Sequence, residues 1–280
     1  RRMDNPSMSE SRLETFTLGR FPKTDWAGEN KPVAIVDGRV IPLADDGEPL
    51  SGSVAWVVGV NDRTFPPLCA RLQVTSLAFY EMRVSDLGPL AALDGVRELG
   101  ITWNTKVVDL EPLSALRSLE LLVLQDIPKV RSLEPIGDLE HLLAVDFSGG
   151  IWNKNRAESL EPIGRLRSLQ ELVLTNLAVG SDGLRPLARC RSLRRLRLSN
   201  QFATEDYAYL AARLPSVECD MLAPFVPLGQ AIGGNDIMVV GKRKPFLNAS
   251  KDAERLARYV RDFERLRSGF AEQVNDTADR

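Results

Sequence analysis

The chain is poor in the residues on which much enzyme chemistry depends. Its 280 residues include a single histidine, His141, and three cysteines, Cys69, Cys190 and Cys219, none of them in a CxxC pair. With a single histidine the chain cannot form a multi-histidine metal site. His141 directly precedes a repeated leucine phrase, which indicates an exposed residue between phrases rather than a catalytic base. Scattered, unpaired cysteines favour a reducing compartment. We therefore expect a non-catalytic protein without cofactor or metal.

Long apolar runs and a strong net charge are also absent. No run approaches the roughly 18 apolar residues of a membrane span, and the N-terminal "RRMDNPSMSESRLETF" lacks the apolar core of a signal peptide. These features, with the cysteines, predict a cytoplasmic location and no membrane span. Lys and Arg (36) nearly balance Asp and Glu (38), so the chain as a whole does not have the charge of a nucleic-acid-binding protein.

What the sequence does contain is one apolar phrase repeated seven times. The copies are "VTSLAF" from Val74, "VRELGI" from Val96, "LELLVL" from Leu119, "LLAVDF" from Leu142, "LQELVL" from Leu169, "LRRLRL" from Leu193 and "VECDML" from Val217. They start 22, 23, 23, 27, 24 and 24 residues apart. This spacing and the LxxLxL template are typical of leucine-rich repeats, so we predict a solenoid.

A second phrase lies about halfway through most units. Its copies are "LGPLAAL" at 87–93, "LEPLSAL" at 110–116, "LEPIGDL" at 133–139, "LEPIGRL" at 160–166 and "LRPLARC" at 184–190. The shared proline suits the first turn of a short helix and would break a central strand. The predicted fold is therefore α/β: a parallel sheet on the concave side, short turns or 3₁₀ pieces on the convex side, and stability from the stacking of neighbouring repeats.

From Val74 the first unit follows the narrower pattern LxxLxLxxNxIxDIxPLxxLxN, with Leu77, Phe79, Asp86 and Pro89 among the residues in step. This unit resembles the short-repeat class of leucine-rich repeats found in bacterial internalins. The resemblance covers about 150 of the 280 residues, and it implies the fold more than the role. Later repeats depart from the pattern at its asparagine position. Asn104 occupies that position, whereas Asp126, Asn176 and Asn200 fall one residue early.

Flanking segments complete the predicted domain organisation. Asp37-Gly38 between two apolar runs predicts a hairpin, and Ser250 is placed to cap an amphipathic helix that packs as a cap on the last repeat. The predicted segments are a polar lead-in at 1–30, a β-rich N-terminal cap at 31–70, a solenoid of seven repeats at 71–223, a C-terminal cap at 224–270 with a strand at 237–240 and a helix at about 251–267, and a disordered tail at 271–280.

The alternation of side chains along a strand assigns the solenoid faces. In "VRELGI", Leu99 and Ile101 point inward, so Glu98 and its equivalents face the concave side. Several of those equivalents are apolar where solvent alone would favour polar residues, which suggests an interface, and Trp152 lies in the longest inter-repeat insertion, 148–159. The predicted partner-binding residues are Tyr80, Glu98, Trp103, Leu121, Val123, Asp146, Trp152, Val173, Arg195, Arg197 and Met221.

Two functions remain open from the sequence. The favoured hypothesis is a monomeric scaffold that recognises a protein or peptide on its concave face. The alternative is an anionic surface, nucleic acid or acidic lipid, bound through the arginine-rich repeat at 185–197 and the basic C-terminal helix. Residues 241–270 carry nine Lys or Arg against four Asp or Glu, although such charge clusters are more often solvated faces.

Overall fold

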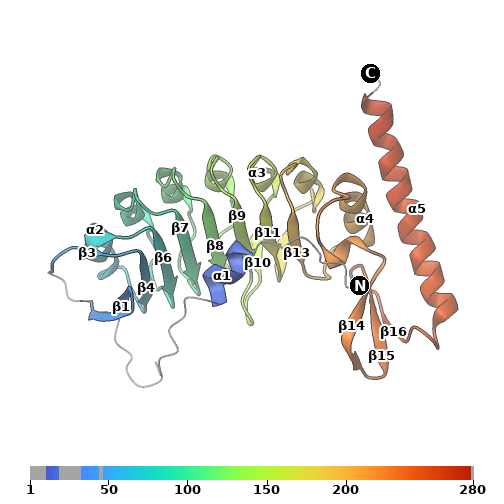
Figure 1. Ribbon diagram of the computed structural model, residues 1–280, viewed down its shortest axis with the longest axis horizontal. Helices are drawn as coiled ribbons and strands as arrows, with labels where there is room; N and C mark the ends of the chain where they lie inside the picture. Colours follow the sequence, from blue (N-terminus) through green and yellow to red (C-terminus); the bar gives the residue numbers. More distant parts are fainter. Residues whose placement is uncertain (1–10, 19–32, 44–46, 279–280) are drawn as a thin grey trace, which may run out of the picture.

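In the computed structural model of the protein, which describes residues 11–18, 33–43 and 47–278, the chain forms a row of stacked repeats (Figure 1). Nine strands make one sheet in the order β13-β11-β9-β8-β7-β6-β4-β1-β2. The strands of successive repeats therefore lie side by side. The seven parallel strands are β4 (Val54–Val58), β6 (Ser76–Tyr80), β7 (Glu98–Thr102), β8 (Leu121–Gln125), β9 (Ala144–Ser148), β11 (Glu171–Leu174) and β13 (Arg195–Leu198). The predicted leucine-rich-repeat solenoid is confirmed.

The register of the sheet stacks equivalent leucines into a continuous core. Leu77 pairs with Leu99, and Leu99 with Leu122, each fully buried. On the convex side the second phrase forms short helical turns with proline at the start, as predicted. These are η2 (Gly88–Ala92), η3 (Glu111–Ala115), η4 (Glu134–Ile136), α3 (Glu161–Gly164) and η5 (Arg185–Arg189). Two small parallel pairs, β3 (Leu50–Ser51) with β5 (Leu72–Gln73) and β10 (Asn155–Ala157) with β12 (Leu177–Val179), join successive turns.

The N-terminal end of the sheet is closed by the predicted hairpin. Strands β1 (Val33–Val36) and β2 (Arg39–Pro42) are antiparallel, and Asp37 and Gly38 at the turn have φ of 47° and 80°, as this turn type requires. β1 also pairs antiparallel with β4, whereas β4 pairs parallel with β6. Helix α2 (Phe65–Arg71) then covers the core. The parallel sheet thus begins at Val54, before the predicted solenoid start at 71.

The seventh phrase does not form the seventh repeat strand that the periodicity predicts. It makes one isolated bridge, Arg195 to Glu218, and then turns into η6 (Asp220–Leu222). Helix α4 (Thr204–Arg213) replaces the short convex turn before it. The chain beyond η6 enters the separate sheet of β14, so no further repeat follows to extend the ladder.

The C-terminal cap contains two more strands than the single strand we predicted, and a longer helix. Strands β14 (Phe225–Ile232), β15 (Asn235–Val239) and β16 (Phe246–Leu247) form a sheet in that order. The sequence of β14 contains Pro227 and Gly229, which an edge strand tolerates. Helix α5 (Ala253–Ala278) extends beyond the predicted end at 267 into the segment 271–280 predicted to be disordered.

Contacts with α4 explain the extension of α5. The ring of Phe270 packs edge-on against that of Tyr209 at 5.4 Å, and the Arg185 guanidinium lies over both rings. Phe263 of α5 is buried in the main core. Figure 1 shows α5 beside α4 at the end of the row. In the part of the chain that the structure describes, no helix combines the length and apolarity needed to cross a membrane.

Candidate binding surface on the concave face

The outward columns of the parallel sheet lie where the alternation of side chains predicts. The middle column runs through Ala78, Gly100, Val123, Asp146 and Val173, each opposite the next in register. Leu122 and Leu124, on either side of Val123, belong instead to the main core inside the solenoid. The assignment of the two faces is therefore confirmed.

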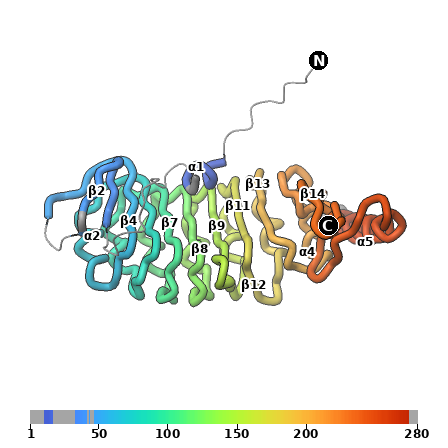
Figure 2. The backbone as a smooth tube through the Cα atoms, turned by 90° about the horizontal axis from the view of Figure 1, so that it is seen from below, coloured from blue at the N-terminus to red at the C-terminus, as the bar shows by residue number. Residues whose placement is uncertain are grey.

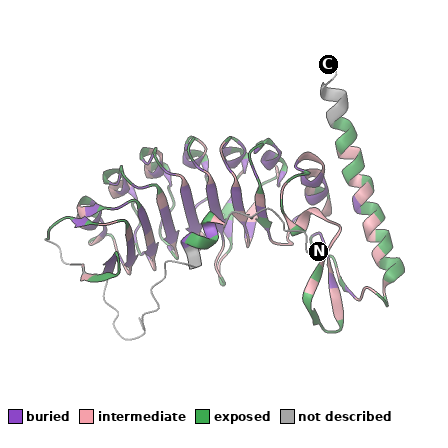
Figure 3. Cartoon of the chain, viewed as in Figure 1, coloured by how far each residue is buried: buried purple, intermediate pink, exposed green. Residues whose placement is uncertain are grey.

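The predicted exposure is wrong for the centre of this face. The exposed fraction of the residue is 1% for Leu121 and 2% for Val123, and Asp146 is also buried. A helix in the predicted polar lead-in, α1 (Arg12–Leu18), packs across the concave side of β8 and β9 (Figures 1 and 2). In Figure 3 the strands beneath it are coloured as buried. The apolar residues of the face are covered by a segment of the same chain.

The helix covers the face with two apolar side chains one turn apart. Leu13 and Phe16 form a cluster of buried residues with Leu121, Val123 and Ala144, and Ala78 and Val173 are packed at its edges. This cluster is distinct from the main core of the solenoid. Spacing of i and i+3 places both anchors on the same side of the helix.

A short polar motif starts the helix. The Ser11 hydroxyl accepts a hydrogen bond from the backbone N–H of Glu14 (3.2 Å), the capping interaction of an S-x-x-E sequence. Ser11 and Glu14 are three residues apart in "SRLETF". This capping signal was available in the sequence, and it marks the residue before the start of α1.

Glu171 of β11 holds the first turn of α1. Its carboxylate accepts hydrogen bonds from the Ser11 hydroxyl (2.9 Å) and from the backbone N–H groups of Arg12 (3.2 Å) and Leu13 (3.3 Å). The Arg195 guanidinium also donates to it at 3.2 Å. A buried carboxylate requires such partners because an uncompensated charge there would be costly.

Two further ion pairs flank the helix. Arg12 pairs with Glu120 at 3.2 Å, and Glu14 pairs with Arg197 at 2.5 Å. Both pairs are substantially exposed, so each contributes little to stability. Their opposite polarity nevertheless fixes the direction in which a helix lies on the face.

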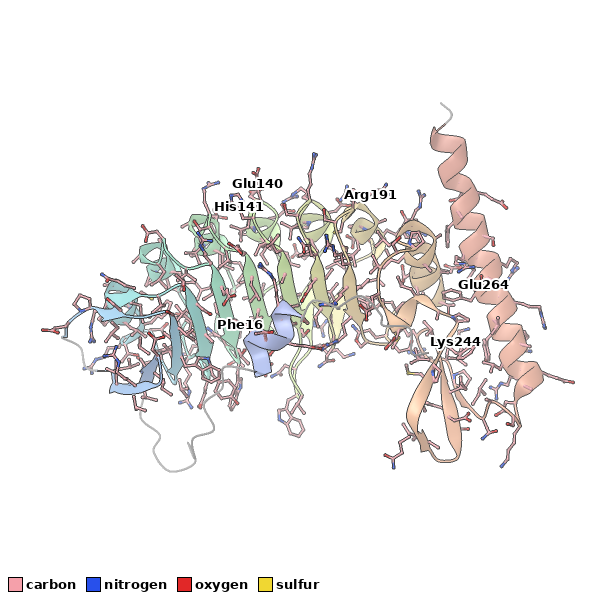
Figure 4. The ribbon with its side chains drawn as sticks, viewed as in Figure 1. Phe16, Glu140, His141, Arg191, Lys244 and Glu264 are labelled. Atoms are coloured by element: carbon pink, nitrogen blue, oxygen red, sulfur yellow. The ribbon has the colours of Figure 1, made fainter. Side chains whose placement is uncertain are left out.

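Gly100 makes room for the aromatic anchor. A Cβ atom added at Gly100 would lie 2.7 Å from Cε1 of Phe16 and 3.0 Å from Cζ. Figure 4 labels Phe16 at helix α1, beside the strands of the sheet. A larger residue at position 100 would therefore displace the ring.

Asp146 is the titrating group of this face. Burial raises its pKa to about 6, although hydrogen bonds from the Ser148 hydroxyl and from Gln125 Nε2, the latter at 2.7 Å, and the Arg197 charge act in the opposite direction. The side chain is thus held by its own sheet beside the α1 cluster. It is placed to make this region sensitive to mildly acidic pH.

Part of the concave face remains open beside α1. A cavity of about 420 Å³ lies between the start of the helix and the last rungs of the sheet. Its walls include Val173, Arg195, Arg197 and Met221 from the predicted set, with Glu218 and Asp220 adding carboxylates. Sequence reasoning missed Glu218 and Asp220 because it assigned them to a seventh strand.

The predicted aromatic residues lie at or beyond the carboxyl ends of the strands. Tyr80 ends β6, and its ring packs edge-on at 6.0 Å against Trp103, which follows β7 and has 45% of its side chain exposed. Trp152 follows β9 in the insertion and is 90% exposed together with its neighbour Ile151. Glu98 begins β7 and is half-buried.

The arginine-rich repeat does not form one basic patch. Arg195 and Arg197 face the concave side and pair with carboxylates, whereas Arg189 on the convex side pairs with Glu161. Figure 4 labels Arg191 on the convex turns of the solenoid, whereas Lys244 and Glu264 lie in the C-terminal cap. This division offers no support for the anionic-surface hypothesis.

Groups suited to metal or redox chemistry do not converge in the described residues. Within those ranges the structure contains no cluster of three or more His, Cys, Asp or Glu side chains placed to hold a metal ion. Cys190 is buried, as predicted for a leucine position, and burial raises its pKa to about 11.

Comparison with known proteins gives matches to solved structures. No family model and no curated protein matches the sequence. An internalin (inlF) from Listeria monocytogenes is 23% identical, with a TM-score of 0.44 over 56% of this chain and 42% of that one. Internalin C2 (inlC2) from the same organism is 20% identical, with a TM-score of 0.45 over 59% and 69% of the two chains. A leucine-rich-repeat protein of Leptospira interrogans is 20% identical, with a TM-score of 0.34 over 56% and 50%.

The leucine-rich-repeat fold is shown by the stacked parallel strands of this chain, and the internalins are solved structures that it resembles. The chain spans 42% of the length of the first of these structures, less than half. The likeness carries no information about a partner.

Proposed function

We propose that the protein is a non-catalytic scaffold that recognises a protein or peptide on the concave face of its solenoid. The supporting observation is the apolar patch of Leu121, Val123 and Ala144, which lies outside the solenoid core and is buried by a separate helix. A sheet surface that already holds a helix through two anchors has the shape and polarity for helical segments.

The open part of the face adds charged recognition groups. Arg195 and Arg197 stand beside Glu218 and Asp220 in the cavity, with Met221 as an adaptable apolar contact. Arginine is enriched at interface hot spots because it combines charge with a wide planar contact. A partner segment entering beside α1 would meet these groups first.

The exposed aromatic residues extend the proposed surface. Tyr80, Trp103 and Trp152 lie at or just beyond the carboxyl ends of parallel strands, which all point to the same edge of the sheet. Trp152 and Ile151 are the most exposed large apolar side chains among the described residues. We assign them to the rim of the interface, around the cavity and the covered patch.

The proposal is tested by affinity purification of the full chain from its native host with mass spectrometry. Arg197→Glu changes the cavity wall, and Arg191→Glu makes the same charge change on the convex side of the same repeat. Specific partners should be lost with Arg197→Glu and retained with Arg191→Glu. Partners that are captured equally by both variants would place the interface elsewhere. Capture that falls steeply with salt for both would instead favour an anionic ligand.

A further inference from the structure

Helix α1 is held on the concave face as a bound peptide is held. Two apolar anchors fill the patch, one carboxylate receives the first turn, and ion pairs of opposite polarity lie at its flanks. The strands beneath it are hydrogen-bonded to each other in unbroken parallel register. The ladder of the sheet therefore does not depend on α1.

The length of α1 indicates that its helical form depends on the face. The helix has seven residues, and isolated helices of fewer than about 12 residues are unstable in water. Its helical form must therefore come from contact with the face. Residues 19–32 connect it to β1, so the helix is always near its site at a high effective concentration.

We infer that α1 is a resident ligand in cis, and that the partner of this face supplies a short amphipathic helix of the same chemistry, which displaces it. This inference rests on the proposed function and names its partner class. Each polar residue at the start of α1 has a partner on the face. The hydroxyl of Ser11 binds Glu171, the basic residue that follows it pairs with Glu120, and the acidic residue two positions later pairs with Arg197.

The apolar anchors complete the recognition pattern. A large aliphatic residue at the position of Leu13 joins the cluster around Val123, and an aromatic residue three positions later lies over Gly100. The partner helix thus has the pattern hydroxyl, basic, aliphatic, acidic, any, aromatic. α1 and this helix exclude one another, because both use the same two apolar positions.

Competition in cis lowers the apparent affinity for the partner. The measured dissociation constant equals the intrinsic constant divided by the fraction of molecules whose face is open. If α1 is docked in nine molecules of ten or more, removing it strengthens binding in trans about tenfold or more. α1 therefore sets the concentration at which the partner binds.

The probe is a fluorescein-labelled peptide with the sequence of residues 10–19, "ESRLETFTLG", titrated with the full chain and followed by anisotropy. The full-length variant Leu13→Ser/Phe16→Ser, whose own helix can no longer dock, should bind the peptide at least tenfold more tightly than the wild type. A peptide with the same two serine substitutions is the matched control and should not bind.

A second variant leaves the apolar residues intact. Glu14→Arg in the full chain sets two cations against each other at Arg197 and should strengthen peptide binding about two- to fivefold, the range of one exposed ion pair. Adding Gly100→Val to the opened chain should abolish peptide binding, because the valine occupies the space of the aromatic ring.

The outcomes separate this inference from the proposed function. Equal peptide binding by wild-type and opened chains, or no binding by either, would overturn the role of α1 as a competitor for a helical partner. If native partners are still lost with Arg197→Glu in that case, the proposed function stands alone. If the peptide binds as expected but no native partner depends on Arg197, the proposed function fails instead.

Discussion

Replacing Phe16 by alanine should release α1 while leaving the solenoid intact. The Phe16 side chain is buried with Val123 and Leu121 in a cluster outside the main core. Loss of its burial costs roughly 1.5–3 kcal/mol, and 1.4 kcal/mol corresponds to a factor of ten. The docking equilibrium should therefore shift towards the open state by about 10- to 100-fold.

Hydrogen exchange with mass spectrometry measures this shift directly. The amide of Thr15 donates to the Ser11 carbonyl at 3.0 Å, so its protection reports the docked helix. Protection of residues 11–18 should fall by that factor in Phe16→Ala, while protection of β7 and β8 stays unchanged. Phe246→Ala, which alters a half-exposed ring on β16, is the matched control.

Two results would refute the reasoning. Unchanged protection of residues 11–18 would mean that Phe16 does not anchor the helix. Loss of protection across β7 and β8 as well would mean that α1 is an integral part of the solenoid, since the change then spreads through the sheet.

Three further predictions follow from single contacts. Gly100→Val should expose residues 11–18 to exchange because its side chain would meet the Phe16 ring, whereas Gly95→Ala, where a Cβ meets open space, should not. Asp146→Asn should raise the free energy of unfolding by up to roughly 3 kcal/mol at pH 7.5 and by nothing below pH 4. Burial raises the pKa of Asp146 from 3.8 to about 6, so the native protein loses stability as pH rises through that value. Asparagine does not ionise, so the variant avoids this loss. Urea denaturation at both pH values checks it, and a pH-independent difference would contradict it. Asn155→Ala should lower unfolding free energy by about 1–3 kcal/mol, because its amide serves the backbone of Ile127, Leu124 and Ser148; an unchanged urea midpoint would contradict that role.

Most of the solenoid could be predicted from the sequence because its information is local and repeated. Each strand contributes inward residues such as Leu99 and Ile101 at fixed spacing, and each convex turn has a proline at its start. Stacking of identical units then leaves few alternative topologies. Asn104 also behaves as its position indicates, buried and bonded to the backbone of Val84, Lys106 and Val107.

The parts that escaped prediction depend on contacts that are distant in sequence. Val123 was assigned correctly to the concave face, but its burial comes from Leu13 and Phe16, more than a hundred residues away. A seven-residue helix with two anchors gives too short a period to stand out. Likewise Phe270, which follows Gly269 in α5, contacts Tyr209 and Arg185, both of which are distant in sequence.

The chemical accessibility of position 123 tests the central claim most directly. In a Val123→Cys chain, alkylation by iodoacetamide can be measured for each peptide by mass spectrometry. The new thiol is thereby distinguished from the native thiols of Cys69, Cys190 and Cys219. The cysteine should react slowly while α1 is docked and at least ten times faster when Phe16→Ala is added. An equal, fast rate in both chains would show that α1 does not cover the face. A rate near zero in both would place the side chain inside the solenoid.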